Sequence, residues 1–276
     1  MIKNAKIIYH DRTRGCFCES KSERHRKAAR EYGYTVFQCG IKQEFVSFRD
    51  AVECLIGKNV DGVVLIPPEQ IDKAGIDLVK ALQNSRIPML LLDRAVYSVF
   101  CDFVTADNKQ GGRLAAEALI RQGHRQIDII MGGANTYTAR KRMEGYREAF
   151  ARNQMAIEDH FIVQGEYTLE AGCRGAKELF EKGVRAMFAS NDCIARGVYR
   201  FADERGLKIG RDLSVVGYDN TEICRWLQPP LTSIDQNTGQ MAEKAVELLI
   251  RRIEGGDGKP ARNYYFTPVL VERNSV

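Results

Sequence analysis

Polar side chains that can form hydrogen bonds follow four separate apolar runs of the sequence. They are Asp93 and Arg94, Asn191 and Asp192, Asp219 and Asn220, and Asp235, Gln236 and Asn237. Carboxylates accept hydrogen bonds, guanidinium groups donate them and amides do both, so this set can pair the hydroxyl groups of a buried polyhydroxylated molecule. A second interpretation stays open, because Asp or Asn after a strand often caps the next helix, and Asp107, Asp192 and Asn220 could do only that. The convergence of four runs favours binding.

The elements that position these side chains are strands alternating with amphipathic helices along the whole chain. Strands are predicted at residues 5–9, 35–39, 62–66, 88–92, 103–106, 126–131, 161–164, 186–189, 214–217 and 232–234. Their continuous apolar character is typical of parallel strands buried on both faces. Helices are predicted at 111–122 and 241–253, each followed by glycine. The alternation predicts an α/β protein with doubly wound parallel sheets, in which ligands bind beyond the carboxyl ends of the strands.

Length and composition are those of a folded globular protein. The chain has 276 residues, 44% hydrophobic and 28% charged, which suits one or two domains. Lys and Arg number 41 against 36 Asp and Glu and are spread along the chain, which is weak support for a nucleic-acid surface. Neither a charged-then-apolar leader nor an apolar run of membrane length is present, so a cytoplasmic protein without a membrane partner is expected.

Motifs of catalysis and of metal binding are missing from the sequence. It contains no G-x-G-x-x-G, no G-x-x-x-x-G-K-[ST] and no G-x-S-x-G, and its four histidines show no metal-ligand spacing. The eight cysteines lie mostly in apolar patterns, where free thiols are expected. Cys16 and Cys18 could bind a metal or sense redox state, but no second ligand pair accompanies them. The sequence therefore predicts no catalytic residue, no cofactor and no metal site.

Several ordered segments resemble the lactose-repressor and galactose-repressor family of bacterial transcription regulators. The strongest are residues 214–220 (SVVGYDN) and 229–236 (PPLTSIDQ), together with the ending 270–275 (LVERNS). Further matches in the family's order are 59–64, 92–94, 107–108, 123–124, 142–146 and 190–192. They extend over nearly the whole chain.

The resemblance implies two doubly wound parallel-sheet lobes of periplasmic-binding-protein type I, joined by three crossings. The N-terminal lobe would take residues 1–105 plus 237–264, and the C-terminal lobe 106–236 plus 265–276. A sugar-like effector would bind in the cleft between them, and lobe closure in a homodimer would change how paired headpieces meet operator DNA. The helix-turn-helix headpiece is not in this chain, so specific DNA binding by the chain alone is not expected.

The ligand contacts implied by the resemblance come from both lobes. They are Phe17, Asp93 and Arg94 in the first lobe, Arg142, Tyr167, Asn191 and Asp219 in the second, and Gln236 at a crossing. Arg142 would offer a forked donor, Asp93 and Asp219 would accept from hydroxyl pairs, and Tyr167 would stack on the ligand. Arg140 could take the place of Arg142.

Two departures from the family leave alternatives open. Residues 12–18 stand where the family has a segment like Asn-Pro-Phe-Phe. Arg12 and Arg14 in this segment could bind an anionic ligand, such as a sugar phosphate or sugar acid, or could simply belong to a solvated loop. The first helix carries Arg24 and His25 where small or apolar residues are usual, near the expected dimer interface. The alternative functions are a solute-binding protein of a sugar transporter and an enzyme built on the same kind of sheet.

Overall fold

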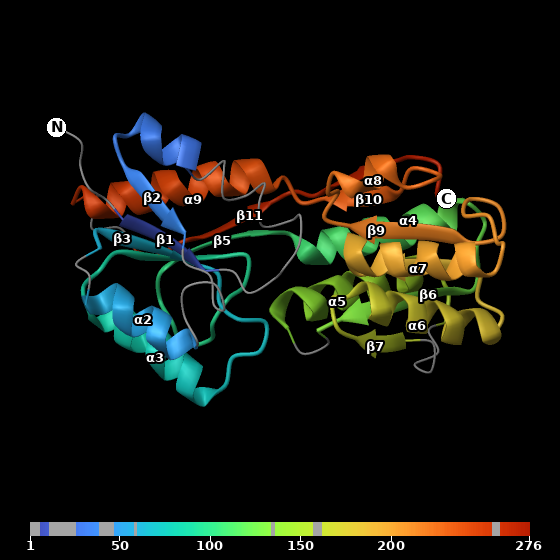
Figure 1. Ribbon diagram of the computed structural model, residues 1–276, viewed down its shortest axis with the longest axis horizontal. Coiled ribbons are helices and arrows are strands. Elements are labelled where there is room, and N and C mark those ends of the chain that lie inside the picture. Colours follow the sequence, from blue (N-terminus) through green and yellow to red (C-terminus); the bar gives the residue numbers. More distant parts are fainter. Residues whose placement is uncertain are drawn as a thin grey trace. The chain divides into compact units, whose positions relative to one another are not determined.

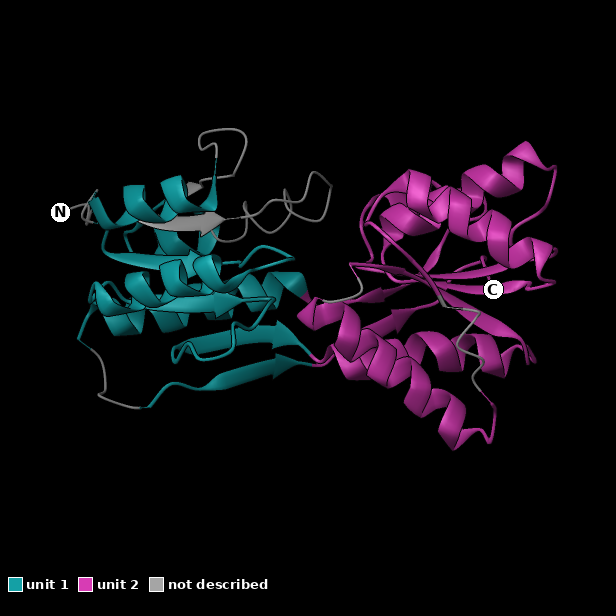
Figure 2. Cartoon of the chain, turned by 90° about the horizontal axis from the view of Figure 1, so that it is seen from below, with its two compact units in different colours: residues 1–106, 238–266 teal, residues 107–237, 267–276 magenta. Residues whose placement is uncertain are grey.

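The computed structural model describes residues 6–10, 26–38, 47–57, 60–133, 136–156, 162–255 and 260–276. In this part of the chain the strands form two six-stranded sheets, each flanked by helices (Figure 1). The chain divides into two compact units, unit 1 with Met1–Ala106 and Thr238–Phe266, and unit 2 with Asp107–Asn237 and Thr267–Val276 (Figure 2). It therefore passes from one unit to the other three times.

Unit 1 is built on a wholly parallel sheet. Its strand order is β11(Asn263–Phe266), β5(Asp102–Ala106), β4(Met89–Leu92), β3(Gly62–Leu65), β1(Lys6–His10) and β2(Thr35–Gln38). Helix α9(Thr238–Ile253) and a helical turn at residues 26–31 cover one face, and α2(Phe48–Gly57) and α3(Lys73–Asn84) cover the other (Figure 1). Leu249 and Val246 of α9 pack in one core with Leu90. Strands β3, β4 and β5 are buried along their whole length, as their continuous apolar runs require.

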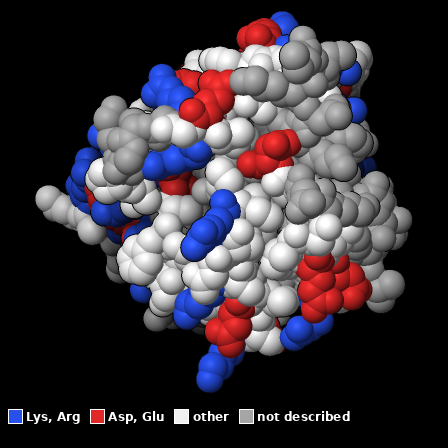
Figure 3. Space-filling view, turned by 90° about the vertical axis from the view of Figure 1, so that its left-hand side faces the viewer, with Lys and Arg blue, Asp and Glu red and all other residues white. Residues whose placement is uncertain are grey.

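Acidic and basic side chains are mixed on the end of unit 1 that Figure 3 views. Blue and red groups alternate there among uncharged surface, and no area of one sign dominates the described residues of this face. Such mixing is typical of a solvated surface rather than a nucleic-acid interface.

Unit 2 has five parallel strands and one antiparallel edge strand. Its order is β12(Val269–Val271), β10(Thr232–Asp235), β9(Ser214–Tyr218), β8(Ala186–Ala189), β6(Ile127–Gly132) and β7(Ile162–Gly165), with β12 antiparallel to β10. Its helices are α4(Asn108–Arg121), α5(Tyr137–Arg152), α6(Leu169–Glu181), α7(Asp192–Glu204) and the short α8(Ile223–Trp226). One core packs α4 and α5 on the sheet and another packs α6 and α7 on it.

Glycines bring α4 and α5 into backbone contact. A Cβ on Gly145 would overlap the carbonyl of Lys109, and a Cβ on Gly112 would overlap the carbonyl of Arg142. Side chains at these two positions would force the helices apart. The close approach sets Arg142 of α5 beside the start of α4.

The predicted α/β class is confirmed, because parallel strands alternate with helices in both units. Each of the ten predicted strands coincides with one of β1 to β10 to within two residues at either end. Strand β11 was not predicted. Its residues Asn263–Phe266 alternate between exposed and half-buried at the edge of the sheet, so it lacks the continuous apolar run of the inner strands.

Candidate binding site at the carboxyl edge of unit 2

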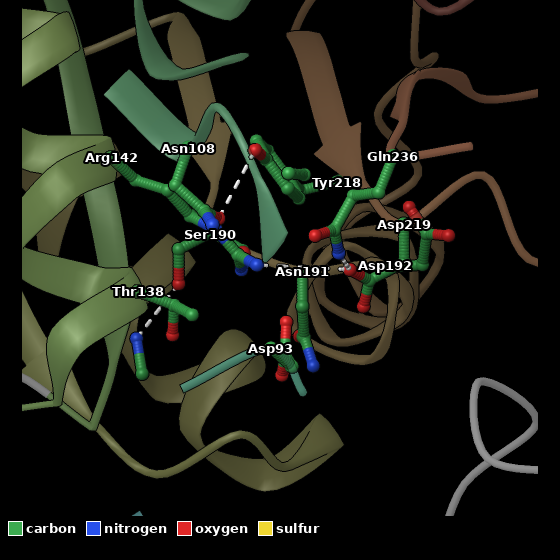
Figure 4. A network of polar contacts seen from close by, with 12 residues as sticks. Asp93, Asn108, Thr138, Arg142, Ser190, Asn191, Asp192, Tyr218, Asp219 and Gln236 are labelled. Carbon is green, nitrogen blue, oxygen red and sulfur yellow. Dashed lines mark hydrogen bonds and ion pairs between the residues drawn. The ribbon is translucent and has the colours of Figure 1, made fainter. Parts of the chain in front are cut away.

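Three neighbouring parallel strands of unit 2 end in polar residues at the same edge of the sheet. Ser190 and Asn191 follow β8, Asp219 follows β9 and Gln236 lies just beyond β10. Arg142 reaches this edge from α5 (Figure 4). The carboxyl edge of such a sheet is where ligands bind in open α/β folds.

Arg142 is the central cation of this edge. Its side chain is buried, with 4% of the residue exposed. Nε donates to Oδ1 of Asn108 at 2.9 Å, and Nη1 donates to the carbonyl of Ser190 at 2.6 Å. The guanidinium carbon lies 3.7 Å from the centroid of the Tyr218 ring, and Nη2 lies 3.9 Å from Oδ1 of Asp219. Bonds on three sides hold the guanidinium plane in one orientation.

Asp219 and Gln236 form the second part of the edge. Nε2 of Gln236 donates to Oδ1 of Asp219 at 2.6 Å. Gln236 is wholly buried, and its Oε1 has no hydrogen-bond partner within the described segments. A buried acceptor without a donor is costly, so this oxygen is suited to a donor that arrives with a ligand.

Tyr167 follows β7, and its ring packs against Gly132 at the end of β6. A Cβ on Gly132 would overlap the Tyr167 ring, so the glycine lets the ring rest on the strand. The Tyr167 hydroxyl is buried, and it too has no hydrogen-bond partner in the part of the chain that the structure describes. An aromatic face with a polar tip is thereby held at this end of unit 2.

The helix-capping alternative applies to some of the polar residues and not to others. Asp107 caps α4 through Gln110 N, as that alternative expected, and Asn191 caps α7 through its Oδ1 and Ile194 N at 2.8 Å. The capping interpretation was wrong for Asp192 and Asn220. Asp192 accepts from Thr221 in the loop after β9 and from Ser233 of β10, and Asn220 donates to Asp235 of β10.

Burial governs the ionisation of Asp192. Desolvation raises the pKa of its carboxyl group, and hydrogen bonds from Ser233 and Thr221 oppose that rise by stabilising the charged form. Burial also raises the pKa of the Cys224 thiol, which therefore stays neutral at physiological pH.

Asp93 and Arg94 follow β4 at the carboxyl edge of the sheet of unit 1. Asp93 is buried and has a φ of 70°, while its amide donates to the carbonyl of Val104. Nη1 of Arg94 donates to the carbonyl of Pro67 at 2.9 Å, and Nη2 lies 3.6 Å from Oε1 of Glu69. Phe17 and the rest of residues 12–18, with Cys16 and Cys18, lie outside the described residues.

The structure separates Arg142 from Arg140. Arg140 is exposed on the outer side of α5, whereas Arg142 is buried against Tyr218. The sequence reasoning did not name Asn108 as a site residue, although residues 107–108 are one of the segments that resemble the family. Asn108 is buried, and its Oδ1 accepts from Arg142 and from the Tyr218 hydroxyl at 3.2 Å.

The described residues contain neither a metal-binding cluster nor a membrane-spanning helix. No group of three or more His, Cys, Asp or Glu side chains there could hold a metal ion. None of the helices in the same segments is both long and apolar enough to span a membrane.

The chain is similar to known proteins over most of its length. Residues 116–276 match the family described as periplasmic binding protein-like domain. The ribose operon repressor of Haemophilus influenzae is 34% identical over 230 residues, which cover 82% of this chain and 67% of the repressor. The transcriptional repressor PurR of Photobacterium profundum is 30% identical over 246 residues, which cover 88% of this chain and 72% of that protein. A solved LacI-family regulatory protein from Chloroflexus aggregans matches with a TM-score of 0.84 and 28% identity, covering 98% of each chain.

The fold and the polar edge of unit 2 define a periplasmic-binding-protein-like domain of the small-molecule-sensing kind. Together with the repressor relatives, they show that the chain belongs to the LacI family of transcription regulators. The resemblance drawn from the sequence is thereby confirmed, as is the predicted class of effector-sensing regulator. The alternative of a transporter's solute-binding protein is not favoured, because these relatives are transcriptional repressors.

Proposed function

We propose that the carboxyl edge of unit 2 binds a small, neutral, polyhydroxylated effector of the sugar type, and that this binding regulates transcription. The observation that carries the proposal is the buried triad of Arg142, Asp219 and Gln236, in which a forked donor and the Gln236 amide both lie beside the Asp219 carboxylate, and Gln236 Oε1 has no hydrogen-bond partner among the described residues. Hydroxyl groups both donate and accept, so one sugar hydroxyl can meet each of these groups.

A neutral effector fits the charges of this edge better than an anionic one. The positive charge of Arg142 lies 3.9 Å from the negative charge of Asp219, and Nε and Nη1 of Arg142 are already bound to Asn108 and Ser190. Little positive potential is left for a phosphate or carboxylate. The anionic alternative rested on Arg12 and Arg14, which lie outside the described residues.

The relatives narrow the choice of probe. One of them is a ribose operon repressor, and ribose is a compact ligand whose hydroxyls match a set of amide, carboxylate and guanidinium groups. Tyr167 supplies an aromatic face and a hydroxyl that has no partner in the described segments, and the amide nitrogen of Asn191 can donate while its oxygen caps α7. D-ribose is therefore the first compound to test.

The rest of the proposal concerns the whole regulator. Units 1 and 2 are the two lobes, and Asp93, Arg94 and Phe17 remain predicted effector contacts from unit 1. The protein is a cytoplasmic homodimer without catalytic activity or cofactor, and it meets operator DNA through a helix-turn-helix headpiece outside this chain. Membership in a family of transcriptional repressors supports the regulatory part of this proposal.

Thermal unfolding with and without candidate effectors tests the proposed function. A ligand that binds only the folded state raises the midpoint by mass action. We expect D-ribose or another neutral sugar to raise it, and Arg142→Ala and Asp219→Ala to abolish the rise while the exposed Arg140→Ala keeps it. Ribose 5-phosphate tests the anionic alternative and adenine tests a base. A shift caused only by these, or one that persists in Arg142→Ala and Asp219→Ala, contradicts the proposal.

A further inference from the structure

The loop that carries Asp219 has a backbone conformation that non-glycine residues seldom adopt. Asp219 has a φ of 107° and Asn220 a φ of 49°, both in the left-handed region. Two such residues in succession persist only where surrounding contacts hold them. The contacts that hold this loop therefore determine where the Asp219 carboxylate points.

A buried network of Asp192 and Ser233 receives the amides of this loop. Oδ2 of Asp192 accepts from the amide of Thr221 at 2.7 Å and from its hydroxyl at 2.8 Å. Oδ1 of Asp192 accepts from the Ser233 hydroxyl at 2.6 Å, and the Ser233 oxygen accepts from the amide of Asn220 at 3.1 Å. Both amides that follow Asp219 thus end on one carboxylate and its serine.

Helix α7 and strand β9 hold Asp192 in place on the side away from the Asp219 loop. Asp192 begins α7 directly after the capping residue Asn191, and a Cβ on Gly217 of β9 would come within 2.5 Å of its Oδ1. Asp192 is 2% exposed and Ser233 is wholly buried, so water cannot readily replace a lost bond. The first turn of α7, the start of the β9–α8 loop and β10 are joined at a single carboxylate.

We propose that Asp192 and Ser233 are positioning residues, which hold Asp219 in its effector-binding orientation without touching the effector. This inference rests on the proposed function for its affinity readout only. The position of Asp219 also has a reporter that needs no effector, because the side-chain amide of Gln236 donates to Asp219 Oδ1.

Ser233→Ala is the mildest test, and Ser275→Ala is its matched control. Both serines are wholly buried in unit 2, Ser233 on β10 and Ser275 in the segment after β12, and each accepts a hydrogen bond from a backbone amide. Ser275 receives the amide of Thr232 and donates to the carbonyl of Val215, near the beginnings of β10 and β9, away from the carboxyl edge. Loss of a buried hydroxyl is common to both variants, and only one of the two contacts the Asp219 loop.

The first readout is nuclear magnetic resonance of the full chain without effector. We expect Ser233→Ala to shift the Gln236 side-chain amide signals and to speed hydrogen exchange of the Asn220 and Thr221 amides, while Ser275→Ala leaves all three near wild type. If the Gln236 signals are unchanged in Ser233→Ala, or move equally in Ser275→Ala, the positioning role is overturned. This experiment tests the positioning role whether or not the chain binds a sugar.

The second readout is affinity for D-ribose by calorimetry. We expect Ser233→Ala and Thr221→Val to weaken binding by about tenfold, and Thr221→Ser and Ser275→Ala to stay within about twofold of wild type. Equal losses in Ser233→Ala and Ser275→Ala would contradict the inference. If the wild-type chain binds neither D-ribose nor another compound of the panel, the proposed function fails while the resonance arm still decides the inference.

Discussion

Arg142 donates from Nε to Oδ1 of Asn108 across 2.9 Å, and this bond joins the middle of α5 to the first residue of α4. The same Asn108 oxygen accepts from the Tyr218 hydroxyl, whose ring lies under the guanidinium. Three elements of unit 2 therefore depend on one cation, which is also the proposed donor to the effector.

Replacement of Arg142 by alanine should remove effector binding and lower stability together. The change takes away two hydrogen bonds and leaves Asp219 without its opposite charge, which we expect to cost about 3 kcal/mol of unfolding free energy. Urea unfolding and calorimetry measure the two effects. Arg140→Ala on the exposed side of α5 is the control, and comparable losses in that variant would show that Arg142 has no special position.

Gly145→Ala should displace Arg142 without changing any polar group. Its new Cβ would overlap the carbonyl of Lys109, so α4 and α5 must separate, at an expected cost of about 3 kcal/mol. We expect the cation to move off Asn108, with loss of effector affinity. Gly57→Ala serves as the control because a Cβ there meets no atom within 4 Å. Wild-type stability and affinity in Gly145→Ala would mean that the helix contact is not what holds Arg142.

The fold could be predicted because burial on both faces leaves an unbroken apolar run in each inner strand. The residues just beyond β8, β9 and β10 could be named for the same reason, since topology brings strand ends to one edge. Their role as effector contacts remains a prediction. Edge strand β11 was not predicted, because its residues alternate between exposed and half-buried and form no continuous apolar run.

Pairings between distant elements could not be predicted from spacing. The position of Asn108 beside Arg142 depends on the backbone contact at Gly112 and Gly145. The local sequence around these glycines does not predict that contact. Asp192 has the sequence context of a helix cap, yet its partners Thr221 and Ser233 come from loops and strands far along the chain. For such residues the local sequence predicts a helix cap, but contacts with distant parts of the chain decide which groups the side chain binds.

Gln236→Glu should make stability depend on pH. The new carboxylate would face Oδ1 of Asp219 at the present 2.6 Å, so two negative charges would share a buried site at neutral pH. One of the two would acquire a raised pKa, and the folded state would bind a proton more tightly than the unfolded state. We therefore expect a loss of about 2 kcal/mol at pH 8 that shrinks as the pH falls. Denaturant unfolding across this range measures it, with exposed Gln228→Glu as control, and a loss that does not vary with pH would contradict the pairing.

His124 should destabilise the fold as the medium becomes acidic. Burial lowers its pKa from the ordinary 6.5, and its Nε2 lies 2.8 Å from the Ser214 hydroxyl. Below that ordinary value the unfolded chain binds more protons at this site than the folded chain, so stability falls as the pH drops through 6.5 towards the folded pKa. We expect His124→Ala to be less stable than wild type at pH 8, with a difference that narrows by pH 5. Parallel pH profiles for the two proteins would show that His124 makes no such contribution.

Trp226 is the residue of unit 2 that we expect to lie in the interface of the proposed homodimer. It is 70% exposed on the short α8, although an indole gains more from burial than most side chains. A tryptophan at the centre of an interface typically contributes about 2 kcal/mol or more, so Trp226→Glu should weaken dimerisation by about 30-fold or more. Because the side chain is exposed within one chain, the fold of the single chain should be unchanged. Sedimentation velocity over a dilution series measures the association, and Phe100→Glu, at 81% exposure in unit 1, is the matched control. Equal weakening in both variants, or an unchanged dimer in Trp226→Glu, would exclude α8 from the interface.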